Sequence, residues 1–125
     1  MENGTATPTT PSGAAALDIS VEASGPWLTV RLRGELDLNT APTLNEQVDD
    51  LVARRSPPRI ALEMSEVTFC DSSGLNTLVR LWRRTTAKDG RLVLLRPPDL
   101  VVRTLEITGL DRYLPMSDTL PDDAP

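Results

Sequence analysis

The pattern of apolar and polar positions predicts two strands at the start of the folded region. Apolar residues alternate with polar ones over residues 17–21 and again over residues 27–33, as in strands with one buried face. A Ser-Gly-Pro turn lies between the two segments, so they could pair as a hairpin. In the second segment the residues expected to face the core are Leu28, Val30 and Leu32. The residues expected on its other side are Trp27, Thr29, Arg31 and Arg33.

A period of three to four residues then predicts three helices. The first begins at Thr40, a plausible N-cap with Pro42 in the first turn, and ends before the Ser-Pro-Pro segment 56–58. The second covers residues 75–88 and the third residues 99–108, and both are followed by glycine. The inward positions, helix by helix, are Leu44, Val48, Leu51 and Val52; Leu75, Leu78, Val79 and Trp82; and Val101, Val102 and Leu105.

Two more apolar segments predict further strands between these helices. Residues that share one apolar face alternate with others over residues 59–64, and Val67 and Phe69 extend the apolar run. Residues 91–95 are continuously apolar after Arg91, as expected for a buried central strand. The resulting order, β-β-α-β-α-β-α, implies parallel strands joined by right-handed crossovers. We therefore expect a single small α/β domain with a four- or five-stranded mixed sheet and helices mainly on one face.

Composition marks the ends of this domain. Residues 1–16 are mostly Thr, Pro, Ala, Gly and Ser, which predicts a disordered N-terminal tail. The domain would span residues 17–118, and residues 119–125 would form a flexible C-terminal tail. The N-terminus lacks a basic segment followed by an apolar one, so no signal peptide is expected.

Charge and residue usage exclude several classes of function. The net charge of −5 argues against non-specific binding to nucleic acid or to anionic membranes. The chain has no histidine, so Ser-His-Asp and Cys-His catalytic sets and His/Cys zinc sites are impossible. Cys70 is the only cysteine, which fits a reducing cytoplasm and is expected to be a small buried thiol rather than a redox group. No metal or other cofactor is expected.

The segment Asp71-Ser72-Ser73-Gly74 carries the most distinctive chemistry of the chain. It lies between an apolar strand and a helix, where Asp or Ser commonly caps the helix. The same position favours an anion, so a phosphate on either serine would be tolerated there. Catalysis by a serine nucleophile lacks a base, because the only lysine, Lys88, lies about four helical turns away. The chain is therefore not expected to be an enzyme.

A second loop should lie beside this segment. Residues 35–40 follow one strand and precede a helix, as residues 71–74 do. Both should therefore lie at the carboxyl end of the sheet, where α/β proteins usually carry their functional sites. The exposed side of the second helix, expected to carry Asn76, Thr77, Arg80, Arg83 and Arg84, would extend this surface, although a solvated helix face explains the arginines equally well.

Four stretches together resemble one known family. VTFCDSSGLNTLVRL is similar to the signature of the STAS domain, and specifically to that of bacterial anti-sigma factor antagonists. VRLRGELDLNTAPTL, RIALEMSEV and LEITGLDRYL agree with the same family in the same order. The resemblance covers about residues 17–115, nearly the whole folded part.

The resemblance implies a phosphorylation switch. The unphosphorylated antagonist would bind an anti-sigma factor that is also a serine kinase, and a sigma factor would be released. Phosphorylation of Ser73 would block this binding, and a serine phosphatase would reset the switch. Asp37 matches the acidic residue that lies beside the modified serine in the family. The partner-binding surface would comprise Asp37, Asn39, Thr40, Asp71, Ser72, Ser73, Gly74, Asn76 and Thr77.

Two other functions remain open at this stage. One is a non-switching STAS docking subunit of a transporter-associated or stress-signalling complex. The other is a nucleotide-binding protein, although the chain lacks the glycine-rich phosphate-binding motifs. The chain is expected to be a monomer or a weak homodimer.

Overall fold

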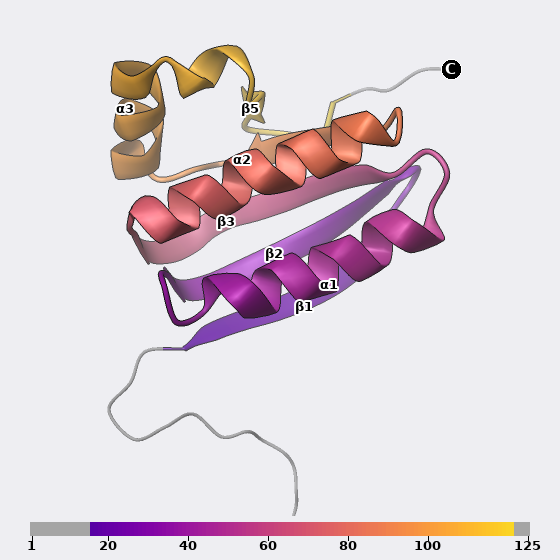
Figure 1. Ribbon diagram of the computed structural model, residues 1–125, viewed down its shortest axis with the longest axis horizontal. Coiled ribbons are helices and arrows are strands. Elements are labelled where there is room, and N and C mark those ends of the chain that lie inside the picture. The colour runs from indigo at the N-terminus through magenta and orange to yellow at the C-terminus, as the bar shows by residue number, and fades with distance from the viewer. Residues whose placement is uncertain (1–15, 122–125) are drawn as a thin grey trace, which may run out of the picture.

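The structure, a computed structural model, describes residues 16–121. Five strands form one sheet in the order β1-β2-β3-β4-β5. Helices α1 and α2 cover one face of this sheet, and α3 stands beside β4 and β5 at its end (Figure 1). The strands are β1 Leu17–Ser24, β2 Trp27–Leu36, β3 Arg59–Cys70, β4 Arg91–Leu95 and β5 Met116–Ser117. The helices are α1 Ala41–Arg54, α2 Ser72–Ala87, α3 Asp99–Thr108 and the short 3-10 helix η1 Leu110–Arg112.

The predicted mixed sheet is confirmed. β1 pairs with β2 as an antiparallel hairpin, with Ser24 opposite Trp27 beside the turn. The pairs β2–β3, β3–β4 and β4–β5 are all parallel. β3 is longer than the alternating segment 59–64 suggested, since it continues to Cys70. β5 and η1 complete the domain after α3.

An aliphatic core fills the space between the sheet and the helices. Its fully buried side chains include Val30, Leu32, Leu62, Leu44, Val48, Val52, Leu78, Leu81 and Leu105. Each such side chain contributes about 1.5–3 kcal/mol when it leaves water. The inward residues expected on α1 are thus confirmed, apart from Leu51, which is half-buried.

The buried side of α2 is rotated from the expected one. Leu75, Val79 and Trp82 are only half-buried, whereas Thr77 is 4 % exposed and Thr85 is 0 % exposed. The reason is the neighbouring helix, because α2 packs beside α1 as well as on the sheet (Figure 1). The prediction that Thr77 lies on the exposed side of α2 is therefore wrong.

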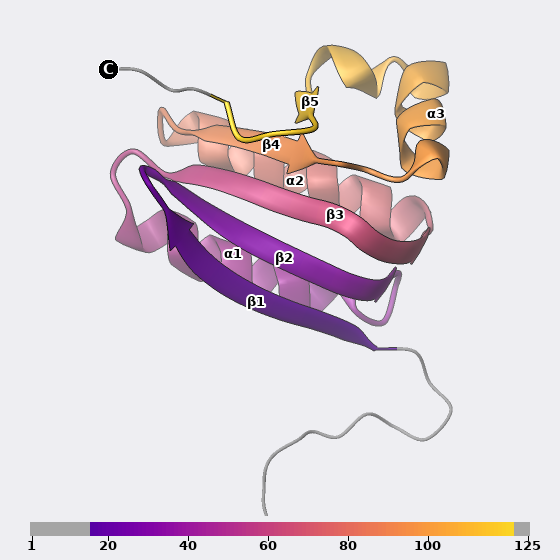
Figure 2. The same ribbon diagram turned by 180° about the vertical axis from the view of Figure 1, so that it is seen from behind.

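The face of the sheet opposite α1 and α2 also carries buried side chains. No helix of the described residues covers it (Figure 2), yet Trp27 is 2 % and Thr29 is 7 % exposed. Trp27 packs in a second apolar cluster with Ala61, Val93 and Leu95, against which Leu120 also packs. The side of β2 expected to lie away from the core is thus buried at this end, because Trp27 packs with side chains of β3 and β4 and with Leu120 after β5.

The predicted tails can be compared with the structure only in part. The expected N-terminal tail, residues 1–16, lies outside the described residues except for Ala16. Residues 122–125 lie outside them too. Since Leu120 packs against the second cluster, the packed part of the chain extends past residue 118.

A half-buried ion pair lies on the same face as this second cluster, with the Arg96 side chain 47 % exposed and the Glu63 side chain 1 % exposed. Glu63 of β3 is 1 % exposed and receives a hydrogen bond from the Ser65 backbone N–H at 3.0 Å. The Arg96 guanidinium donates to both Glu63 carboxylate oxygens. Burial alone would raise the pKa of Glu63, but the hydrogen bonds from Ser65 and Arg96 and the Arg96 charge outweigh it and hold that pKa below its ordinary value of 4.5.

A close contact fixes the start of α2 against the sheet. Gly74 is buried in the first turn of α2. A Cβ atom at this position would lie 2.6 Å from the Leu36 carbonyl oxygen and 2.8 Å from the Cys70 sulfur. Any side chain would therefore push the helix away from the ends of β2 and β3, so the backbone approach itself requires glycine here.

We predict that the stability of the chain falls in acid through Glu63. Because the pKa of Glu63 is lower in the folded chain than in the unfolded chain, its contribution is fully present above about pH 4.5. That contribution is lost as the pH falls through the lower folded-state pKa. Urea unfolding at a series of pH values from neutral to acid measures this. Glu63→Gln should be less stable at neutral pH and should lose less stability in acid; the same pH dependence as the wild type would contradict the assignment.

We also predict that Gly74→Ala lowers the free energy of unfolding by about 1–3 kcal/mol, because the methyl group overpacks the contact with β2. Helix propensity alone predicts the opposite, since alanine is favoured over glycine by about 1 kcal/mol in a helix. Urea unfolding followed by circular dichroism distinguishes the two. Ser72→Ala, at an exposed position of the same turn, is the control and should change stability by about 0.5 kcal/mol or less. A Gly74→Ala variant at least as stable as the wild type would rule out this contact.

Candidate functional site

The carboxyl ends of β2 and β3 bring the two predicted loops together. Leu36 and Cys70 are opposite each other in the parallel pairing of these strands. One residue farther on, the Asp71 backbone N–H donates to the Leu36 carbonyl at 3.2 Å. The loop that begins at residue 37 and the turn 71–74 therefore leave the sheet side by side, as the sequence predicted.

The Asp71 carboxylate joins these two segments. Its Oδ1 accepts a hydrogen bond from the Gly74 backbone N–H at 2.9 Å, so Asp71 is the N-cap of α2. Its Oδ2 accepts from the Leu38 backbone N–H in the other loop at 3.3 Å. One side chain thus caps α2 and holds the 37–40 loop against its first turn.

Asp37 organises the loop before α1 in the same way. Its Oδ1 accepts hydrogen bonds from the backbone N–H groups of Asn39, at 2.9 Å, and Thr40, at 3.0 Å. This pattern is an Asx-type turn that leads the chain into α1. The Asp37 carboxylate is therefore a structural element of the loop and not simply a water-facing charge.

Thr40 adopts a different role from the one expected. It precedes α1 as predicted, but its side chain makes no capping hydrogen bond to the helix. Its hydroxyl instead donates to the Glu35 carbonyl at 2.8 Å and accepts from the Asp37 backbone N–H at 3.0 Å. Thr40 thus occupies the predicted N-cap position, but its hydroxyl does not cap the helix because the Asp37 turn engages it in the loop.

The two serines differ in exposure. Ser72 is exposed and Ser73 is half-buried, both in the first turn of α2. Among residues 16–121 neither hydroxyl makes a hydrogen bond. Because Asp71 satisfies the helix cap, both hydroxyls are left available. Of the other predicted contact residues, Asn39 and Asn76 are exposed, whereas Thr77 is buried and accepts a hydrogen bond from the Asn45 amide at 3.4 Å.

The arginines along α2 are not equivalent. Arg80 makes two hydrogen bonds to Asp49 of α1, at 2.9 Å and 3.2 Å, and Arg84 pairs with the same carboxylate at 3.0 Å. These two arginines fasten α2 to α1 and are best understood as parts of a solvated helix pair. Arg83 points elsewhere, into a groove with Trp82 and Tyr113.

Two exposed apolar side chains next to the site were not singled out from the sequence. Leu38 is 70 % exposed in the loop after β2, and Phe69 is 45 % exposed near the end of β3. Phe69 belongs to an apolar run in the sequence, where an exposed and a buried aromatic residue look alike.

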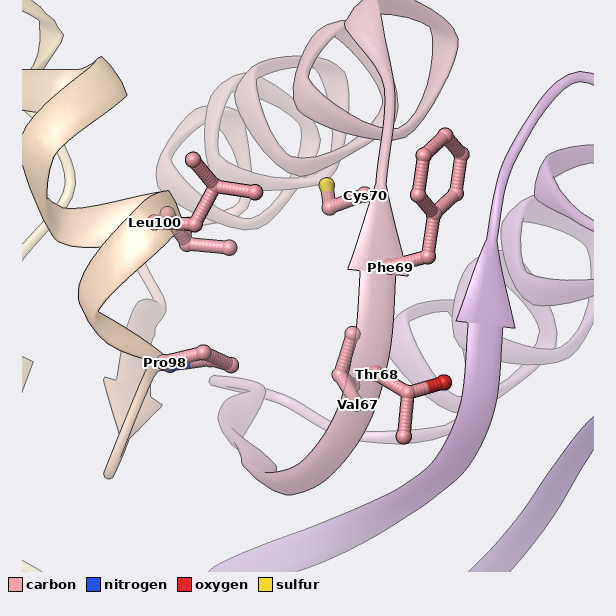
Figure 3. Close-up of a pocket in the computed structure, with 7 residues that line it drawn as sticks. Val67, Thr68, Phe69, Cys70, Pro98 and Leu100 are labelled. Carbon is pink, nitrogen blue, oxygen red and sulfur yellow. The ribbon is translucent and has the colours of Figure 1, made fainter.

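The cavity between β3 and α3 is too small to hold a ligand. Val67, Cys70 and Leu100 are among its lining residues, and Phe69 projects to the other side of the strand (Figure 3). Its volume of about 30 Å³ compares with roughly 300–1,000 Å³ for small-molecule sites. This cavity therefore gives no support to a bound nucleotide.

Cys70 is not a reactive thiol. Burial raises the pKa of its thiol to about 11, and the negative charge of Asp71 acts in the same direction. The thiol therefore stays protonated near neutral pH, and the helix N-terminus does not activate it. The prediction was a small buried thiol without redox function; Cys70 is half-buried, and its raised pKa agrees with the absence of a reactive thiolate.

Two further kinds of feature are absent from residues 16–121. No group of three or more His, Cys, Asp or Glu side chains there could hold a metal ion. None of the helices in the same part of the chain is long and apolar enough to cross a membrane.

Known proteins resemble this chain over nearly all of its folded part. The STAS domain family model matches residues 18–122. The anti-sigma F factor antagonist of Paenibacillus polymyxa is 34 % identical over 104 residues, which cover 82 % of this chain and 87 % of that protein. The anti-sigma-B factor antagonist of Bacillus subtilis is 28 % identical over 101 residues, covering 81 % of this chain and 91 % of that protein.

A solved structure agrees with these relatives. The crystal structure of an anti-sigma factor antagonist from Mycobacterium paratuberculosis has a TM-score of 0.73 and 28 % identity, covering 90 % of this chain and 92 % of that one. This homology confirms the prediction of a regulator rather than an enzyme. The chain belongs to the STAS domain family and is homologous to anti-sigma factor antagonists.

Proposed function

We propose that this protein is an anti-sigma factor antagonist switched by phosphorylation of Ser73. In its unphosphorylated form it binds a cognate anti-sigma factor with serine kinase activity, and a sigma factor is freed. Phosphorylation of Ser73 by that kinase blocks the binding, and a serine phosphatase restores it. These partners act on transcription in the cytoplasm, which is where we place the protein.

The observation that carries this proposal is the double hydrogen bond of Asp71. Its carboxylate caps α2 through Gly74 and holds the Leu38 backbone of the neighbouring loop. Ser73 therefore lies in a fixed turn beside a second fixed loop, and its hydroxyl is not needed for either. A side chain that contributes little to the fold is free to carry a regulatory group.

The surface around Ser73 suits a protein partner. Leu38 and Phe69 are exposed apolar side chains at the ends of β2 and β3, and Asn39 and Asn76 are exposed polar ones. Apolar contacts surrounded by polar groups are typical of regulated protein interfaces. The cavity between β3 and α3, with its volume of about 30 Å³, gives no support to a nucleotide site.

The position of Ser73 explains how a phosphate could act without unfolding the domain. The first backbone N–H groups of α2 and the positive end of its dipole tolerate a negative group there. The phosphate adds about −1.5 to −2 charges beside the Asp71 carboxylate. A partner surface that complements the neutral form would then be repelled, so the switch acts on the interface and not on the core.

We predict that a negative charge at residue 73 weakens partner binding, and that the same charge at residue 72 weakens it less. Ser73→Asp should weaken binding to the anti-sigma factor about tenfold or more, because one uncompensated charge at an interface costs a few kcal/mol. Ser73→Ala should bind like the wild type. Pull-down from the native cell with the three proteins as bait, followed by titration of the captured partner, measures this.

Ser72→Asp is the matched control for this experiment, since it adds the same charge one exposed position earlier. It should weaken binding less than Ser73→Asp does. Equal binding by the wild type and by Ser73→Asp would contradict the switch and favour a constitutive docking subunit.

We also predict that the captured kinase adds one phosphate to the wild type and to Ser72→Ala, and none to Ser73→Ala. Intact mass spectrometry after incubation with ATP measures the addition, and peptide mapping locates it. Undiminished phosphorylation of Ser73→Ala would overturn the assignment of the residue while leaving the family membership untouched.

A further inference from the structure

A groove on the outer side of α2 has no role in the proposed switch. It lies between the second half of α2 and η1, and its lining residues are Val79, Trp82, Arg83, Leu110 and Tyr113. Its volume of about 330 Å³ is about ten times that of the cavity behind β3. This is enough space for a large side chain of another molecule.

An aromatic pair forms the wall of this groove. The rings of Trp82 and Tyr113 are 5.7 Å apart between centroids and are tilted by 55°. Trp82 is partly buried and packs against the main core, which fixes its position. Tyr113 remains 51 % exposed. The pair therefore presents a rigid apolar surface to the solvent, of the kind that anchors side chains at protein interfaces.

Arg83 gives this surface a positive charge that the chain does not neutralise. Among residues 16–121, Arg83 has no ion-pair partner, whereas Arg80 and Arg84 on the same helix are both paired with Asp49. No acidic residue is among the described residues that line the groove. The groove therefore carries a positive charge on a chain whose net charge is −5.

We propose that this groove binds a short acidic peptide segment of a partner protein. A large apolar side chain of the peptide packs against Trp82 and Tyr113, and a neighbouring carboxylate pairs with Arg83. Charge complementarity selects this occupant: a guanidinium prefers a carboxylate in a bidentate pair, and the aromatic wall selects an apolar neighbour. The single cation and the net negative charge of the chain disfavour a polyanion such as nucleic acid.

This docking groove is separate from the switch surface. Val79, its lining residue nearest to Ser73 along α2, is about 9 Å farther along the helix axis. The inference therefore does not depend on phosphorylation of Ser73 or on an anti-sigma factor partner, and it can be tested with the purified chain alone.

Selection from random heptapeptides displayed on phage tests the proposal. Phage that bind the Arg83→Glu variant are removed first, so that peptides recognising any other surface are discarded. The remaining phage are then selected on the wild-type chain. We expect enrichment of peptides in which Asp or Glu stands next to Leu, Phe or Trp. No enrichment, or enrichment of basic or uncharged peptides, would overturn the proposal.

The enriched peptide is then synthesised with a fluorescent label, and its affinity is measured by anisotropy. Its binding should be about tenfold weaker to Arg83→Glu and to Tyr113→Ala than to the wild type. Arg55→Glu makes the same charge change at an exposed residue after α1 and should leave the affinity unchanged. If Arg55→Glu weakened peptide binding equally, the effect would come from overall charge, and the proposal that the groove binds the peptide would be overturned. Tyr113→Ala keeps the test valid even if the charge reversal disturbs the fold.

Discussion

The arrangement of the two loops at the carboxyl ends of β2 and β3 depends on the two hydrogen bonds of one carboxylate. Asp71 accepts from the Gly74 backbone N–H in α2 and from the Leu38 backbone N–H in the loop that leads to α1. The ends of two parallel strands bring these segments within reach of each other, but only this side chain links them directly. Gly74 completes the arrangement, because a side chain at that position would collide with the end of β2.

This arrangement makes helix capping and regulation compatible. A helix N-terminus needs an acceptor for its unpaired N–H groups, and Asp71 supplies one from outside the helix. Ser73, two residues farther on, is then free to carry a phosphate that the same helix end can accommodate.

Sequence patterns predicted the elements well and their surroundings less well. Alternation and helical periodicity reflect which residues face the core, so the pairing of β1 with β2 and the inward side of α1 could be predicted from local sequence. The burial of Thr77 and Trp27 could not be predicted in this way, because Thr77 is covered by α1 and Trp27 packs in a cluster with Leu120 after β5. The sequence pattern of the helix did not reveal that the Thr40 hydroxyl would bond within the Asp37 turn instead of capping α1, because that turn involves residues before the helix. The exposure of Leu38 and Phe69 likewise depends on how the two loops meet.

The proposed switch requires that a phosphate on Ser73 change the partner surface while the domain stays folded. Both parts can be measured on one sample: the chain fully phosphorylated at Ser73 is titrated with the anti-sigma factor, and its amide NMR spectrum is recorded. Binding should be weaker by about tenfold or more, with chemical-shift changes confined to residues around 37–40 and 71–76. Unchanged binding, or shifts throughout the core of β3 and β4, would contradict it.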